Sequence, residues 1–164
     1  KLTDEIYITY PAPTYTATPG NRTTDSKQHG VEVTASLRPI RQIRIDAVYT
    51  HLKATEYGVT EVRRPGDIAS VNATLFSKDE RFSTTLTVRY NGRMDDLAYI
   101  DPSYVPVRVS LKPFTLVNLN AQYKLSDRFS VFGRVENLFD VKYEEVFSFA
   151  TPGAAAYAGA RVAF

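Results

Sequence analysis

The sequence contains no cysteine, no tryptophan, only two histidines and no long hydrophobic run. Without cysteine the chain has neither a disulfide framework nor a thiolate site. The lack of an apolar run of about eighteen residues excludes a membrane-spanning helix. The formal charge is only +2, with Lys and Arg dispersed, which argues against nucleic-acid binding. His29 and His51 lack metal-ligand spacing, so we expect no metal site, and no catalytic constellation points to an enzyme or a cofactor.

The most regular pattern in the chain is strict alternation of apolar and polar residues near its C-terminus. Between residues 116 and 125 every second residue is apolar, as Val117, Leu119 and Tyr123 illustrate. The pattern resumes at Phe129 after a short corner at residues 126–127, and a last alternating segment ends at Phe164. A period of two is typical of a strand with one apolar face. Together with eleven Tyr and nine Phe, it predicts an all-β protein.

Eight such segments can be recognised along the chain. They cover residues 5–10, 30–38, 42–52, 67–76, 82–91, 116–125, 129–136 and 156–164. Short connections at 39–41, 77–81 and 126–127 alternate with long ones at 11–29, 53–66, 92–114 and 140–155. Tilted strands of about ten residues cross a bilayer, and bacterial outer-membrane barrels have short periplasmic turns and long extracellular loops. We therefore predict an antiparallel transmembrane β-barrel segment of about eight up-and-down strands.

The direction of the two faces is the assumption on which this prediction rests. We expect the apolar face to meet lipid and the polar face, with Arg44, Asp46 and Arg134, to line a watery bore. The alternative is a soluble sandwich or lipocalin-like barrel with its apolar face inward, which alternation alone does not exclude. The alternation of short and long connections favours the interpretation as a membrane barrel. Aromatic residues near the segment ends are expected to form the interfacial girdles: Tyr10, Tyr49, Phe76, Tyr90, Tyr123 and Phe164.

The run Glu-Asn-Leu-Phe-Asp-Val-Lys-Tyr at residues 136–143, with a final strand ending on Phe164, resembles the C-terminal end of TonB-dependent outer-membrane receptors, and of the cobalamin-receptor type in particular. The likeness is strongest over residues 115–164. It implies a location in the bacterial outer membrane and active uptake of a bulky nutrient such as cobalamin or an iron-siderophore. Receptors of this family close a 22-stranded barrel around an N-terminal plug. Residues 1–164 would then be the C-terminal part of the barrel, coupled to the TonB complex through a missing N-terminal part.

A second interpretation is a self-contained eight-stranded outer-membrane barrel with a structural or adhesive role, since eight is an allowed strand number. The resemblance favours the fragment. In a receptor of this type the long loops help to form an extracellular vestibule, where aromatic rings and a few polar groups suit a bulky small-molecule ligand. The candidate ligand-binding residues are Arg93, Asp96, Tyr99, Asp101, Tyr104, Arg108, Tyr143, Phe147 and Phe149.

Two further features of the C-terminal region have expected roles. Asn137 and Asp140 are predicted to shape the exit from their strand through side-chain bonds to nearby backbone. The last strand resembles the signal that the barrel-assembly machinery reads, which makes that machinery and outer-membrane lipid the expected partners. The signal residues are Ala156, Ala158, Ala160, Val162 and Phe164.

Overall fold

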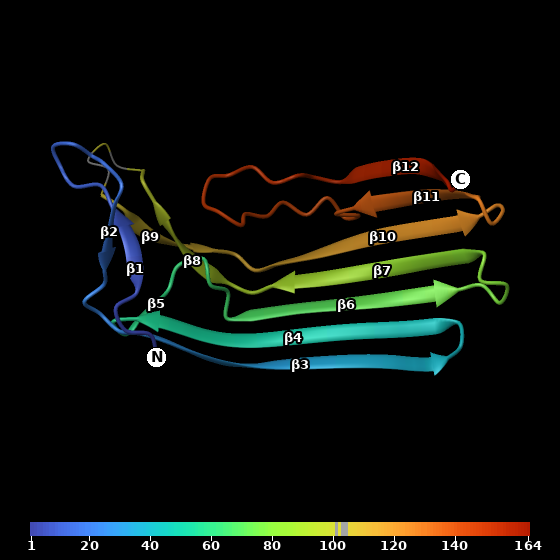
Figure 1. Cartoon of the computed structure of the whole chain (residues 1–164), viewed down its shortest axis with the longest axis horizontal. Helices are drawn as coiled ribbons and strands as arrows, with labels where there is room; N and C mark the ends of the chain where they lie inside the picture. Colours follow the sequence, from blue (N-terminus) through green and yellow to red (C-terminus); the bar gives the residue numbers. More distant parts are fainter. Residues whose placement is uncertain (101, 103–104) are drawn as a thin grey trace.

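The computed structural model describes residues 1–100, 102 and 105–164. Its main feature is one antiparallel sheet with strand order β12-β11-β10-β7-β6-β4-β3, in which neighbouring strands follow one another up and down (Figure 1). The short strand β5 (Val59–Thr60) pairs with β4. The spanning strands are β3 (Ser26–Ile40), β4 (Ile43–Glu56), β6 (Asp67–Phe76), β7 (Phe82–Asn91), β10 (Phe114–Lys124), β11 (Phe129–Glu136) and β12 (Ala155–Val162).

The registers place the predicted apolar residues on one continuous face of this sheet. Leu119 on β10 lies opposite Leu86 on β7 and Val135 on β11. Because side chains at paired positions point to the same side, the alternation continues across all seven strands. This face is not packed in a dry centre, since Leu119 is 36% exposed and Val33 on β3 is 55% exposed. The result agrees with a lipid-facing wall and not with a soluble sandwich.

The opposite face carries hydrogen-bonded polar side chains. The Thr87 hydroxyl donates to the Asn72 amide oxygen over 2.7 Å, and the hydroxyls of Thr74 and Thr85 are 2.9 Å apart. Arg44 pairs with Asp46 at 2.8 Å on the same face. Polar groups that satisfy one another in rows are suited to the aqueous interior of a barrel.

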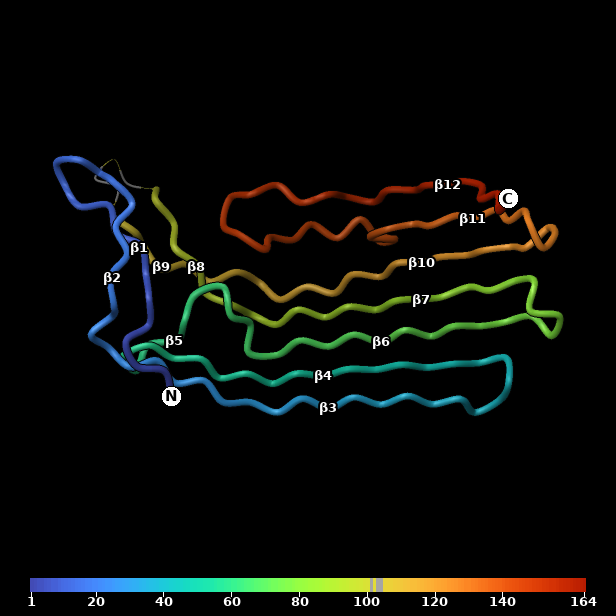
Figure 2. Tube along the Cα trace, in the orientation of Figure 1, coloured from blue at the N-terminus to red at the C-terminus, as the bar shows by residue number. Residues whose placement is uncertain are grey.

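The two ends of the sheet differ, as predicted. Short turns lie at the end that also holds the C-terminus, and the long connections lie at the other end (Figure 2). Two small sheets lie outside the main sheet: β1 (Ile6–Thr9) pairs with β2 (Thr18–Asn21) in the segment before β3, and β8 (Met94–Ala98) pairs with β9 (Val107–Leu111) in the connection between β7 and β10. In the described part of the chain no helix has the length and apolar character needed to cross a membrane.

The first predicted segment, residues 5–10, is not a strand of the main sheet. Only Ile6–Thr9 is extended, and it pairs with β2 among the long connections, where Pro11 and Pro13 follow it. Four residues are too few to span a bilayer. Tyr10 therefore lies outside the main sheet, and its expected girdle position is wrong. Phe76 is also wrongly placed in a girdle, because it lies opposite Ser83 on the polar face. Tyr49, Tyr90 and Tyr123 do lie on the apolar face.

Two irregularities of the sheet matter for the site. First, β3 and β12 end the strand order, and the described residues show no pairing between them. Second, β11 is shorter than β10 at the long-loop end, because their last pair there is Leu119 with Val135. Residues 114–118 of β10 extend beyond it. The Leu138 amide donates to the Val117 carbonyl and the Asn137 amide donates to the Asn118 side-chain oxygen, both at 2.8 Å.

Candidate ligand site among the long loops

The loop of residues 137–154 starts from a fixed turn built by Asn137. This residue has a positive φ of 47° and is 4% exposed. Its side-chain oxygen accepts the Val141 N–H at 2.9 Å, while its amide nitrogen donates to the carbonyls of Val141 and Pro152 at 3.0 and 3.3 Å. Asparagine tolerates this backbone region and satisfies nearby backbone groups. The predicted structural role of Asn137 is confirmed.

Asp140 holds the other end of the same loop. Its carboxylate accepts the Ala154 N–H at 2.9 Å and the Lys142 ammonium at 3.0 Å, and these bonds, the Ala154 one foremost, lower the pKa of Asp140. A Cβ at Gly153 would lie 2.5 Å from the Asp140 carboxylate oxygen, so any larger residue there would displace that carboxylate. Asp140 therefore shapes the strand exit as predicted.

From this base the loop folds back over the polar face of the sheet. The Asn137 backbone N–H donates to the side-chain oxygen of Asn118 on that face at 2.8 Å. Further along the loop, Glu145 forms an ion pair with Arg89 of β7. The rings of Tyr143 and Phe114 lie 4.5 Å apart with a tilt of 39°. The loop thus lies on the polar face of the sheet and covers the end of that face where the long connections are.

Asp96 on β8 joins three of the long connections. Its side chain is fully buried and accepts the Arg63 Nε–H at 2.7 Å, the Leu97 N–H at 2.8 Å and the Phe147 N–H at 2.8 Å. Burial raises the pKa of the Asp96 carboxyl, but the hydrogen bonds from Phe147, Leu97 and Arg63 outweigh it, and the pKa is lowered. An ionised Asp96 therefore fastens the loop of residues 137–154 to the β8–β9 hairpin and to Arg63.

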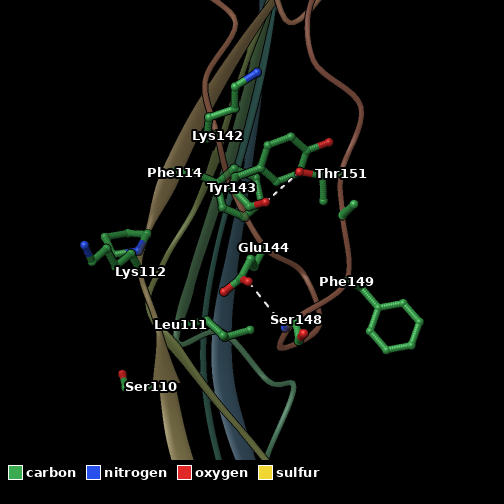
Figure 3. Close-up of a pocket in the computed structure, with 12 residues that line it drawn as sticks. Ser110, Leu111, Lys112, Phe114, Lys142, Tyr143, Glu144, Ser148, Phe149 and Thr151 are labelled. Atoms are coloured by element: carbon green, nitrogen blue, oxygen red, sulfur yellow. Dashed lines mark hydrogen bonds between the residues drawn. The ribbon is translucent and has the colours of Figure 1, made fainter. Parts of the chain in front are cut away.

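A cavity of about 680 Å³ lies between this loop and the start of β10 (Figure 3). Its shape is maintained by the Thr151 hydroxyl, which donates to the Tyr143 carbonyl at 2.6 Å, and by the Ser148 N–H, which donates to Glu144 at 3.3 Å. The volume suits a small-molecule site, and the lining combines aromatic, apolar and charged groups. The lining residues are Ser110, Leu111, Lys112, Pro113, Phe114, Lys142, Tyr143, Glu144, Ser148, Phe149, Ala150 and Thr151.

The structure brings together only part of the predicted ligand set. Tyr143 and Phe149 line the cavity, with the Phe149 ring turned away from the strands in Figure 3. The expectation that Asp96 contacts ligand is wrong, because its buried carboxylate already accepts hydrogen bonds from Arg63 and from the Phe147 backbone N–H. Phe147 contributes its backbone N–H to Asp96.

The remaining predicted positions lie away from the cavity or cannot be placed. Arg108 donates to Asp95 and to the Thr60 carbonyl, both at 2.9 Å, so it braces the hairpin. Arg93 and Tyr99 are exposed and do not line the cavity. Asp101 and Tyr104 lie outside the described residues.

Sequence reasoning missed Phe114, Lys112 and Lys142 as lining residues and Arg89 as an anchor of the loop. Arg89 could have been noticed, because it follows Thr85 and Thr87 on the polar face of its strand. No local pattern signals the contact between residues 89 and 145, which are far apart in the chain.

An antiparallel sheet with an exposed apolar face, a polar opposite face, short turns at one end and long loops at the other is the wall of an outer-membrane β-barrel. The match to a family model makes this specific. Residues 1–138 match the family described as TonB dependent receptor-like, beta-barrel, and the chain belongs to that family. Its members are transport receptors of the bacterial outer membrane, not enzymes. The match includes the first 114 residues, for which alternation and spacing alone carried the prediction.

Individual relatives agree with this assignment. The vitamin B12 transporter BtuB of Photobacterium profundum is 29% identical over 121 residues, which are 73% of this chain and 18% of the relative. The pyoverdine outer-membrane receptor FpvA of Pseudomonas aeruginosa PAO1 superposes with a TM-score of 0.76 at 20% identity, over 99% of this chain and 26% of that structure. The copper transporter OprC gives 0.75 at 18% identity, over 99% and 27%. The chain thus spans about a fifth to a quarter of the proteins it matches.

Proposed function

We propose that residues 1–164 are the C-terminal part of the barrel of an outer-membrane receptor that takes up a bulky nutrient, cobalamin or an iron-siderophore. The energy would come from the TonB complex, through a part of the protein beyond this chain. The observation that carries the proposal is the 680 Å³ cavity, because an inward-folded loop places an aromatic pair and two lysines where a ligand arriving from outside would meet the wall.

Two nutrient classes are supported by different relatives. The similarity in sequence to a vitamin B12 transporter favours cobalamin. The fold is similar both to a pyoverdine receptor and to a copper transporter, with TM-scores of 0.76 and 0.75, so an iron-siderophore is compatible with the fold but is not selected by it. The Tyr143–Phe114 ring pair offers apolar contact area, while Lys112 and Lys142 offer positive charge to polar groups of the ligand.

The open ends of the strand order support a fragment over a self-contained eight-stranded barrel. Backbone groups along a strand edge that faces lipid must be paired, because hydrocarbon provides no hydrogen-bonding partner. In the described residues β3 and β12 do not pair with each other. Further strands would therefore be needed on both sides of this sheet.

The proposal is tested by titrating the full-length protein in detergent with cyanocobalamin and, separately, with ferric siderophores. Replacing Tyr143 with Leu should weaken binding of the true ligand about tenfold, since an aromatic contact in a binding pocket contributes about 1–2 kcal/mol. The matched control is Tyr10→Leu, which changes an exposed tyrosine outside the cavity and should leave binding unchanged. Equal effects of the two replacements, or no binding of any of these nutrients, would contradict the proposal.

A further inference from the structure

The apolar face of the main sheet carries basic residues in one place only. Among the paired positions of this face that the structure describes, β6, β7, β10, β11 and β12 contain no lysine, arginine or histidine. On β3 and β4 the face becomes basic at the end near β5 and the long connections (Figure 1). There His29 lies opposite Lys53, and Lys27 lies opposite Thr55 one row further out. We call the four basic residues the outer basic cluster: Lys27, His29, His51 and Lys53.

The outer basic cluster begins where the aromatic girdle ends. Tyr49 and Tyr90 share one row of the apolar face, with Ala69 between them, and Lys53 follows Tyr49 by four residues on β4. Four residues extend about 13 Å along a strand, and a tilt of about 40° leaves about 10 Å along the membrane normal. The polar layer outside the hydrocarbon is about 5–8 Å deep on each side. The cluster thus lies at the level of the outer-leaflet headgroups.

The carboxylate beside the cluster on the apolar face is already engaged. Among the described paired positions of this face, Asp67 on β6 is the one carboxylate, and it lies opposite His51. Its Oδ1 accepts the Tyr49 hydroxyl at 2.6 Å and lies 2.9 Å from His51 Nδ1. Asp67 therefore balances the charge of His51 when this imidazole is protonated. Within the part of the chain that the structure describes, neither Lys27 nor Lys53 has an ion-pair partner.

A cavity of about 490 Å³ opens beside Lys27 at the same end of the sheet. Its lining is rich in hydroxyl groups and comprises mainly Thr23, Thr24, Asp25, Lys27, Thr55 and Tyr57. Both members of the row formed by Lys27 and Thr55 line it, so it opens on the apolar side of the sheet.

The acidic groups at this cavity have partners of their own. Asp25 pairs with Lys1 at 2.7 Å. The Thr24 hydroxyl donates at 3.1 Å to Glu56, which forms an ion pair with Arg22. The charge of Lys27 is therefore available to a ligand in the cavity.

We propose that the outer basic cluster and this cavity bind the phosphorylated sugar headgroup of a glycolipid in the outer leaflet of the membrane. Lys27 and Lys53 supply charge-assisted bonds to phosphate at the membrane surface. Threonine hydroxyls both donate and accept hydrogen bonds, as the hydroxyls of a sugar require. Tyr57 is 81% exposed and offers a ring face to a sugar. A lone phosphate group needs no cavity of this volume, which favours a glycolipid over a simple phospholipid.

The first experiment is native mass spectrometry of the full-length protein, stripped of lipid in detergent and then titrated with diphosphoryl lipid A. Saturable binding of one lipid A molecule to this site is expected. Lys27→Gln and Lys53→Gln should each weaken it about fivefold through loss of one cation beside the phosphate, while Lys53→Arg should keep most of the affinity. Lys78→Gln is the matched control, because it removes an exposed cation from a short turn at the opposite side of the membrane, and it should have no effect.

The second experiment separates the sugar from the phosphate. Phosphatidylglycerol carries a phosphate without a sugar and should bind more weakly than lipid A. Tyr57→Leu should weaken binding of lipid A and leave binding of phosphatidylglycerol unchanged, whereas Tyr10→Leu, which alters another exposed tyrosine outside the cavity, should change neither. Inorganic phosphate in excess should not displace lipid A.

Three outcomes would overturn the proposal. They are a failure of lipid A to bind, the same affinity for lipid A in Lys27→Gln, Lys53→Gln and Lys78→Gln, and binding of phosphatidylglycerol as tight as that of lipid A. The site rests on the barrel wall and not on the proposed transport of a nutrient. Nutrient binding and its loss in Tyr143→Leu report on the loop cavity separately, so failure of one site is distinguishable from failure of the other.

Discussion

Arg89 on the inner face of β7 pairs with Glu145, a residue of the loop that follows β11 and lies 56 positions further along the chain. Both side chains are about half exposed, so the ion pair contributes at most about 1 kcal/mol. Its importance lies in position, because it fixes the middle of the loop against the wall.

The first prediction concerns this pair. Arg89→Gln and Glu145→Gln should each speed amide hydrogen exchange in residues 142–149, and the double replacement should have no larger effect than Arg89→Gln alone, since Glu145→Gln then removes a contact that is already lost. Arg93→Gln removes an exposed arginine nearby and serves as control. Additive effects of the two replacements would show that they act through different contacts.

The second prediction concerns acid. The pKa of Asp96 is lowered in the folded protein, so its stabilising contribution is present above the ordinary aspartate pKa of about 3.9 and is lost as the pH falls through the lowered value. Pepsin cleavage within residues 139–154 should therefore rise sharply at the lowest pH. In Asp96→Asn the loop should be cleaved readily at every pH where pepsin acts, while Asp127→Asn, in an exposed turn, should behave as wild type. A wild-type pH profile in Asp96→Asn would argue against the role of Asp96.

The third prediction tests the contact between Gly153 and Asp140. Gly153→Ala should displace the Asp140 carboxylate and break its bond to the Ala154 N–H, at a cost of about 1 kcal/mol measured by urea unfolding. In a protein that already carries Asp140→Ala, Gly153→Ala should cost almost nothing. Gly66→Ala is the control, because its Cβ would lie 3.7 Å from the nearest atom, an ordinary contact. Equal losses at both glycines would contradict the prediction.

The fourth prediction tests the direction of the two faces. Val71 lies on the apolar face and its neighbour Asn72 on the polar face, opposite Asp46. Val71→Arg should cost about 2–4 kcal/mol in full-length protein unfolded from lipid vesicles, since it places a charge in hydrocarbon. Asn72→Arg should cost less than about 1 kcal/mol, because it faces water and Asp46. The opposite order would mean that the apolar face is not the lipid-facing one.

The fifth prediction rests on the proposed assembly signal. The apolar side of β12 faces outward, in line with Phe129 and Val131 of β11, and carries Ala156, Ala158, Ala160 and Val162. Phe164 is fully exposed. Phe164→Ser in the full-length protein should reduce the amount of folded receptor in outer-membrane fractions several-fold. Ala163→Ser should not. Normal amounts with Phe164→Ser would remove the support for the signal.

The faces of the seven spanning strands could be predicted because a period of two is a local property of the sequence. The same pattern at residues 5–10 was misleading. Its alternation is genuine, but only Ile6–Thr9 is extended, and its partner β2 (Thr18–Asn21) has no alternation of its own. The position of this segment therefore depends on the strand with which it pairs, and the sequence of one strand does not specify its partner.

The loop contacts were harder to predict for the same reason. The turn at Asn137 and Asp140 was foreseen from bonds to residues close in sequence, those of Asn137 with Val141 and of Asp140 with Lys142. The bonds of Asn137 with Pro152 and of Asp140 with Ala154 reach across the loop. The burial of Asp96 depends on Arg63 and Phe147, which come from two other connections. An aspartate in a long loop looks like a ligand contact until the fold shows which donors surround it.

The unequal lengths of β10 and β11 have a consequence for the outline of the barrel. Residues 114–118 rise above the last pair of these strands, and five residues correspond to about 17 Å along a strand. The rim is thus stepped, with its lower side at β11 and β12. The loop that covers this side is fastened from within by Glu145 and Asp96, so at the step a loop and not a strand completes the inner surface of the wall.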